Sequence, residues 1–325
     1  MDSQTPGLSS SEVRNWLELP LDVLSLIFLK LGVIDILFRA QSVCSVWRNF
    51  SKEPLLFRSI DMRNGWNSFD HQDYDIEKIL REALDRSSGQ LVAFSMADFC
   101  NDESLAYIAD RSGELRCLRL VTCYEVNCDA LINLAKTSVM LEELEICHCS
   151  FTGDKIDMLK TIGSVCPQIK LFRLNCPFFK CSDIECDDEA LAIAESMPEL
   201  RHLHLFGNQV TNVGLREILD GCPHVESLDL RQCFNLNLKG DLLKICRDRL
   251  IKLRLPNDST DDYEFPGAAR DGSDVFSEGS YLSDSDDDSG FDYHPNFDFD
   301  RGNGFDSDSD FGYGNELPYD PEYYD

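Results

Sequence analysis

The chain has 325 residues, of which 43% are hydrophobic, and its formal net charge is −29. An acidic excess of this size argues against nucleic-acid binding, because proteins that bind nucleic acid present a basic surface. No apolar run reaches the roughly 18 residues that a membrane helix needs, and the polar residues 1–15 do not form a secretory signal. We therefore expect a protein of the nucleus or cytoplasm, or both, whose 14 cysteines are reduced thiols.

Three short helices are predicted between residues 12 and 60. The first begins after Pro20, carries apolar residues at helical spacing and ends at Gly32. Asp35 is expected to cap the second helix, and Trp47 lies in the third. A unit of about 40 residues rarely buries this much apolar surface alone, so a partner or an adjoining domain is expected.

The spacing of these residues is specific. Its fixed points are Leu19-Pro20, Asp22-Val23-Leu24, Ile27, Leu31, Asp35, Val43-Cys44, Trp47-Arg48 and Pro54-Leu55-Leu56-Phe57. This pattern resembles an F-box, with Asp22 where Glu is commoner and Ser45 where Arg is common. The resemblance implies docking on a Skp-type adaptor and, through it, on a cullin. The residues expected to carry the docking are Leu19, Pro20, Leu24, Ile27, Leu31, Val43 and Trp47. The alternative is a helical cap on the following repeats, in which Leu24 and Trp47 would also be apolar.

Internal repetition predicts the fold of residues 91–257. Apolar residues spaced as Leu-x-x-Leu-x-Leu recur with starts 24 to 31 residues apart, at Leu91, Leu115, Leu141, Ile169, Leu200, Val225 and Leu250. Each repeat continues into a helical pattern, and two of these helices end in Cys-Pro. The period is in or near the range of leucine-rich repeats. The cysteine positions resemble the cysteine-containing subclass that often follows an F-box. Residues 61–90 are expected to cap the N-terminal end of the solenoid.

Residues 258–325 are predicted to be disordered, as are residues 1–11. From Pro256 onward the chain holds 21 acidic residues against two arginines, and such like-charge segments repel themselves. The tail offers acid-flanked candidate phosphorylation sites at Ser283, Ser285, Ser289, Ser307 and Ser309. A solubilising tail without regulation remains the alternative.

The strand residues that face away from the helices form predicted files across the sheet, because side chains alternate along a strand. One file consists of Ser95, Arg119, Glu145, Arg173, His204, Asp229 and Arg254. A second consists of Arg116, Glu142, Lys170, Arg201, Glu226 and Ile251. Both a self-neutralising charge ladder and a platform for a protein substrate fit this alternation. Since neither charge dominates, we expect a substrate not to be chosen by bulk charge.

No nucleophile–base pair, phosphate loop or His-Glu-x-x-His motif appears in the sequence, so we expect no enzyme activity and no cofactor. Cys176, Cys181 and Cys186, one repeat after Cys147-His148-Cys149, are residue types that zinc prefers. Cys149 already fills a repeat position, however, so we expect no metal. The expected architecture is α/β: a three-helix F-box over residues 12–60, then a short leucine-rich-repeat solenoid with concave parallel strands and convex helices. The resemblance implies a substrate receptor of a Skp–cullin–F-box ubiquitin ligase. The alternative is a repeat scaffold unconnected with a ligase.

Overall fold

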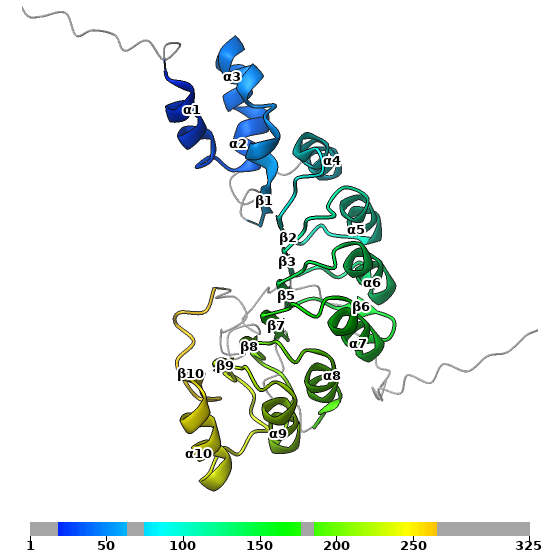
Figure 1. Ribbon diagram of the computed structural model, residues 1–325, viewed down its shortest axis with the longest axis vertical. Helices are drawn as coiled ribbons and strands as arrows, with labels where there is room; N and C mark the ends of the chain where they lie inside the picture. The colour runs from blue at the N-terminus through cyan, green and yellow to red at the C-terminus, as the bar shows by residue number, and fades with distance from the viewer. Residues whose placement is uncertain (1–18, 64–74, 177–184, 265–325) are drawn as a thin grey trace, which may run out of the picture. The chain divides into compact units, whose positions relative to one another are not determined.

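A computed structural model describes residues 19–63, 75–176 and 185–264 of the chain. In these residues a parallel sheet runs down the molecule with helices along one side of it (Figure 1). The strand order is β1-β2-β3-β5-β7-β8-β9-β10, so each strand lies beside its neighbour in the chain. The predicted repeat solenoid is confirmed.

The strands and helices alternate along the chain. The strands of the long sheet are β1 (Ser59–Met62), β2 (Ala93–Ala97), β3 (Cys117–Val121), β5 (Glu143–Cys147), β7 (Leu171–Asn175), β8 (His202–His204), β9 (Ser227–Asp229) and β10 (Lys252–Arg254). The helices beside them are α4 (Ile76–Ser87), α5 (Asp102–Ala109), α6 (Cys128–Thr137), α7 (Lys155–Val165), α8 (Asp188–Ser196), α9 (Asn212–Gly221) and α10 (Gly240–Arg249). Two short strands, β4 (Val126–Asn127) and β6 (Phe151–Thr152), pair with each other.

The predicted apolar template forms the core between sheet and helices. Phe94, Leu118, Leu144, Phe172 and Leu203 occupy matching register positions on successive strands, and each is fully buried. Each repeat covers only the next one, so these side chains join one continuous core instead of separate ones. The predicted N-terminal cap is a full repeat unit, because β1 pairs in parallel with β2 and α4 follows it.

Close approach of neighbouring helices depends on two glycines. A Cβ atom on Gly163 of α7 would lie 2.6 Å from the Cβ of Ser196 in α8. A Cβ atom on Gly221 of α9 would lie 2.8 Å from the carbonyl carbon of Ala194, and closer still to its oxygen. Helix α8 therefore packs so closely against α7 and α9 that Gly163 and Gly221 have no room for a larger side chain.

The N-terminal unit contains α1 (Leu21–Phe28), α2 (Val33–Phe38) and α3 (Ser45–Phe50), with short 3-10 turns η2 (Ala40–Ser42) and η3 (Pro54–Phe57). The three predicted helices are confirmed, but the prediction that Asp35 caps the second was wrong. Helix α2 begins three residues earlier than a cap at Asp35 implies, after Gly32, and Asp35 in its first turn pairs with Arg39 at 2.6 Å. Buried Val33 and Ile34 explain the earlier start, since they anchor this turn in the core.

The prediction that the disordered tail begins at residue 258 was wrong for the first seven residues of that tail. Residues 258–264 are described, and they contact the sheet through ion pairs and a stacked tyrosine. The physical reason is that their carboxylates meet arginines of the repeats.

The five serines predicted as phosphorylation sites lie outside the described residues, as do residues 1–11. Within the described residues, no helix has the length and apolar character needed to cross a bilayer.

Candidate interaction surfaces

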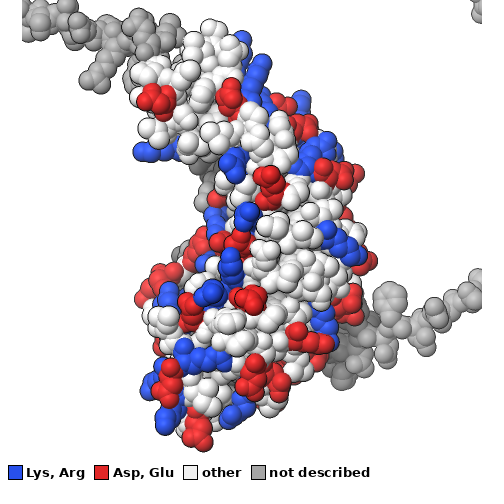
Figure 2. Space-filling view, viewed as in Figure 1, with Lys and Arg blue, Asp and Glu red and all other residues white. Residues whose placement is uncertain are grey.

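Helices α1–α3 expose an unusual amount of apolar side chain. Leu21 is 67% exposed, Leu26 62% and Val43 58%. The exposed apolar surface also includes Val23, Leu29, Val46 and Leu55. In Figure 2 charged side chains are sparse over this end of the molecule and dense over the repeats. Apolar side chains gathered in this way on a small domain mark an interaction site. We call these seven residues the apolar surface.

The interior of the same unit is a small aromatic cluster. Phe28 is fully buried and makes edge-to-face contacts with Trp47 and Phe50, each at a centroid distance of 5.2 Å. Leu24 is 1% exposed and lies one helical turn from Phe28. The cluster therefore holds α1 against α3 and leaves the other side of α1 facing solvent.

The residues predicted to dock on an adaptor divide between this core and the surface. Leu24 was a wrong choice for docking, because the core of the chain itself covers it. Trp47 and Leu31 pack half-buried against the same core. Leu19 and Ile27 are also half-buried, whereas Pro20 and Val43 are exposed. A docking role for these six residues stays a prediction.

Sequence reasoning did not select Leu21, Val23, Leu26 or Leu29. The signal was present, because apolar residues surround the whole circumference of α1 and its C-terminal turn. A surface helix with one covered side shows a single apolar stripe, and a helix apolar all round has a second partner.

The strand register confirms the predicted order of the first file. Arg119 pairs in register with Glu145, Glu145 with Arg173, Arg173 with His204, and the file continues through Asp229 to Arg254. The Glu145 carboxylate accepts hydrogen bonds from Arg119 Nε at 2.9 Å and from Arg173 Nη1 at 3.2 Å. The ladder thus links three neighbouring repeats.

The expectation that this face has no dominant sign stays a prediction, although burial within the first file is uneven. Glu145 is 1% exposed and Asp229 4%, so both acids are covered and neither can contact a substrate directly. Arg119, Arg173 and Arg254 keep between a quarter and a third of their side chains exposed. Exposed acids lie beside these arginines: Glu143, 41% exposed, pairs with Arg119, and Glu264, 50% exposed, pairs with Arg173.

The second predicted file also forms ion pairs. Glu142 lies 2.5 Å from Arg116 Nη1 and 2.8 Å from Lys170 Nζ, and Arg201 pairs with Glu226 at 2.6 Å. Hydrogen bonds from Lys170 and Arg116 lower the pKa of the Glu142 carboxyl. These groups are more exposed than the first file, and exposed pairs contribute little to stability.

His204 makes the stability of the repeats depend on pH. Burial, with the Arg173 guanidinium, lowers the pKa of His204 to about 4 from an ordinary value of 6.5. Between these values the unfolded chain binds more protons than the folded chain, so the folded state loses stability as the pH falls. We expect His204 to make the protein about 1–2 kcal/mol less stable at pH 5 than at pH 7.5.

Urea unfolding at the two pH values checks this. His204→Gln should weaken the pH dependence. An unchanged pH dependence in His204→Gln would show that the pKa of this imidazole is the same in the folded and the unfolded chain.

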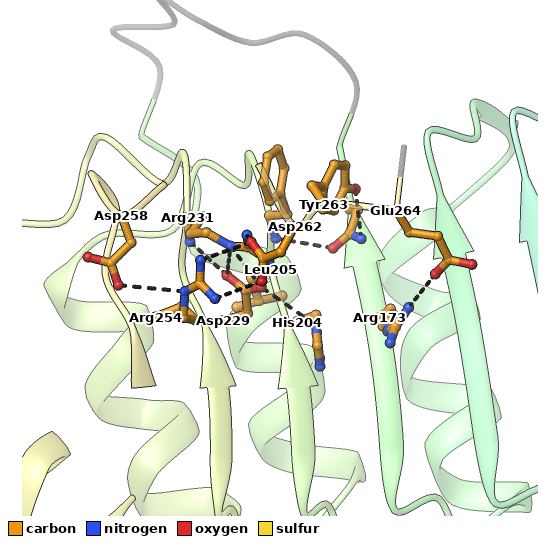
Figure 3. A network of polar contacts seen from close by, with 12 residues as sticks. Arg173, His204, Leu205, Asp229, Arg231, Arg254, Asp258, Asp262, Tyr263 and Glu264 are labelled. Carbon is orange, nitrogen blue, oxygen red and sulfur yellow. Dashed lines mark hydrogen bonds and ion pairs between the residues drawn. The ribbon is translucent and has the colours of Figure 1, made fainter. Parts of the chain in front are cut away.

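The C-terminal ends of the strands hold a site that sequence reasoning missed (Figure 3). Residues 262–264 lie across these ends. The ring of Tyr263 stacks on Phe206 at 3.9 Å with an interplanar angle of 11°. Its hydroxyl lies 3.0 Å from Asn175 Nδ2, which donates to it, and 3.0 Å from His148 Nε2. Burial raises the pKa of this hydroxyl, which therefore stays protonated.

Arginines receive the acids on both sides of Tyr263. Asp262 accepts hydrogen bonds from Arg231 Nη1 at 2.6 Å and from Arg254 Nη1 at 2.8 Å. Glu264 lies 2.8 Å from Arg63 Nη1 and 3.3 Å from Arg173 Nη1. Hydrogen bonds from Arg254, with the charge of Arg231, lower the pKa of Asp262 to about 2. We call Arg63, His148, Arg173, Asn175, Phe206, Arg231 and Arg254 the strand-end site.

Comparison with known proteins agrees with both halves of this architecture. Residues 16–63 match the family model described as F-box-like. The F-box protein SKIP19 of Arabidopsis thaliana is 42% identical over 289 residues, which cover 89% of this chain and 93% of that protein. This chain belongs to the plant F-box/leucine-rich-repeat proteins.

Other Arabidopsis thaliana relatives of this F-box/leucine-rich-repeat protein are named for the same two parts, an F-box and leucine-rich repeats. Putative F-box/LRR-repeat protein 23 is 46% identical over 257 residues, which cover 78% of this chain but 56% of that relative. Putative F-box/LRR-repeat protein 22 is 43% identical over 266 residues, which cover 81% of this chain and 84% of the relative. All seven residues of the apolar surface lie within the segment that matches the F-box model.

Proposed function

We propose that this protein is the substrate-recognition subunit of a Skp–cullin–F-box ubiquitin ligase. The F-box would dock on a Skp-type adaptor, and through it on a cullin, while the repeats hold a target protein. The observation that carries the proposal is the apolar surface of α1–α3, because it lies on the F-box and the described part of the chain leaves it uncovered.

The mechanism requires no catalytic residue in this chain. Holding a target beside an activated ubiquitin converts a bimolecular encounter into an effectively unimolecular one, and this alone accounts for large rate increases. We therefore propose a non-enzymatic adaptor. Its partners would meet it in the nucleus or the cytoplasm, where the free thiols of Cys123, Cys222 and Cys233 would remain reduced.

Co-expression with a Skp-type adaptor, followed by size-exclusion chromatography, tests the proposal. We expect the two proteins to elute together as a complex of one copy each. A well-folded chain that elutes without the adaptor would contradict the proposal and favour a repeat scaffold unconnected with a ligase.

A further inference from the structure

The strand-end site has the chemistry of a receptor for one kind of peptide. Phe206 forms an apolar floor, and Asn175 and His148 lie where they contact a phenol hydroxyl. On one side Arg231 and Arg254 receive a carboxylate, and on the other side Arg63 and Arg173 receive a second. Guanidinium groups placed in this way select planar anions by charge and by geometry.

The receptor side of these contacts is buried, whereas the two carboxylates of the segment are exposed. Phe206, Asn175 and Arg231 are at most 6% exposed. Asp229, itself buried, orients Arg231 by accepting from its Nε at 3.0 Å and its Nη2 at 2.6 Å. In contrast, the side chain of Asp262 is 59% exposed and that of Glu264 50%. Contacts with such exposed carboxylates exchange readily with those of another chain.

The strand-end site also extends beyond Asp262–Glu264. A cavity of about 180 Å³ remains beside the segment, bordered by His204, Ser227 and Lys252. The site draws on residues that lie between β1 and β10, so one short segment contacts most of the repeat array.

We propose that the strand-end site binds the target, and that it takes an acidic peptide with a tyrosine between two carboxylate residues. Asp262-Tyr263-Glu264 is then a tethered stand-in for the target. A tethered segment acts at an effective concentration in the millimolar range, so a target must match it closely to displace it. That the bound peptide belongs to a ubiquitination target rests on the proposed function. Peptide binding itself is measured without the adaptor, so the peptide proposal and the proposed function can fail independently.

Fluorescence anisotropy with a labelled peptide of residues 259–266 (Ser-Thr-Asp-Asp-Tyr-Glu-Phe-Pro) tests the proposal. The full chain with Asp262→Asn, Tyr263→Ala and Glu264→Gln has its own segment weakened. We expect this opened variant to bind the peptide at least 10-fold more tightly than the wild type. The matched control Asp261→Asn should behave as the wild type, because among the described residues the side chain of Asp261 hydrogen-bonds to Ser259 of the same segment and not to the strand-end site.

Two further comparisons test whether the recognition is specific. A peptide with Phe in place of Tyr loses the hydroxyl contacts with Asn175 and His148, and we expect it to bind about 5-fold more weakly. Adding Arg254→Gln to the opened variant should weaken binding at least 10-fold. Equal binding of both peptides, or no effect of Arg254→Gln, would overturn the proposal.

The wild-type chain gives a measurement that does not depend on the folding of a variant. Saturating peptide should raise hydrogen exchange at residues 258–264 as the peptide displaces them. If the peptide does not bind the opened variant and does not change exchange in the wild type, then the segment is a fixed part of the fold and the proposal is wrong.

Discussion

Replacing Leu21 and Leu26 with aspartate is expected to lower the affinity for a Skp-type adaptor at least about 100-fold. Both side chains are more than 60% exposed, so the change should leave the folded state intact. In the proposed complex, however, each aspartate would be buried against apolar surface without a partner. Isothermal titration calorimetry of the purified chains measures the loss directly.

Ile251→Asp is the matched control for this variant. Ile251 is 84% exposed, but it lies beside β10 at the far end of the repeats. The same chemical change there should leave the affinity within about 2-fold of the wild type. Leu24→Ala is a different case, because that residue lies in the core and its loss should lower stability. An adaptor that binds the Leu21/Leu26 variant normally would place the interface elsewhere.

Gly221→Ala is expected to lower the free energy of unfolding by about 2–3 kcal/mol. In an exposed helix the same change would stabilise, since alanine forms helices better than glycine. Here the added methyl group meets the backbone of Ala194 in α8, which cannot move away as a flexible side chain would. Helices α8 and α9 must therefore separate, and the core beneath them loses contacts.

Gly113→Ala provides the control, because a Cβ atom there meets nothing within 4 Å. This variant should unfold at the urea concentration of the wild type or slightly above it. A Gly221→Ala variant as stable as the Gly113→Ala variant would show that the packing of α8 against α9 is looser than the structure indicates.

Strand positions could be predicted from the sequence because the repeat constrains them. The side-chain period of two fixes which residues face the core, and a repeat start every 24 to 31 residues fixes the register. This is why the neighbours of Glu145 were identified correctly. Burial of Glu145 and Asp229 was not predictable in the same way, because it depends on how the arginines on adjacent strands fold over them.

The segment after residue 257 shows a limit of reasoning from local composition. Its acids repel one another, and this favours disorder. Order at Asp262–Glu264 comes from Arg63, Arg173 and Arg231, which lie up to about 200 residues away in the chain. Only the stacking of repeats brings those arginines to the same ends of the strands. A search for arginines directly after the predicted strands, such as Arg63 and Arg231, could have pointed to the site.

Leu24 illustrates a second limit. The F-box pattern identifies which positions of α1 are apolar. An apolar residue, however, can either pack in the core or contact a partner protein. Assigning each to one role requires the position of α3, and the contact of Phe28 with Trp47 determines it.

The most direct test of the central claim is hydrogen exchange of the full chain with and without a Skp-type adaptor. The account predicts that the adaptor protects amides in residues 21–57 and leaves β5, β7 and residues 258–264 unchanged, because docking and target binding use separate surfaces. Protection of the repeats, with none in α1–α3, would contradict it.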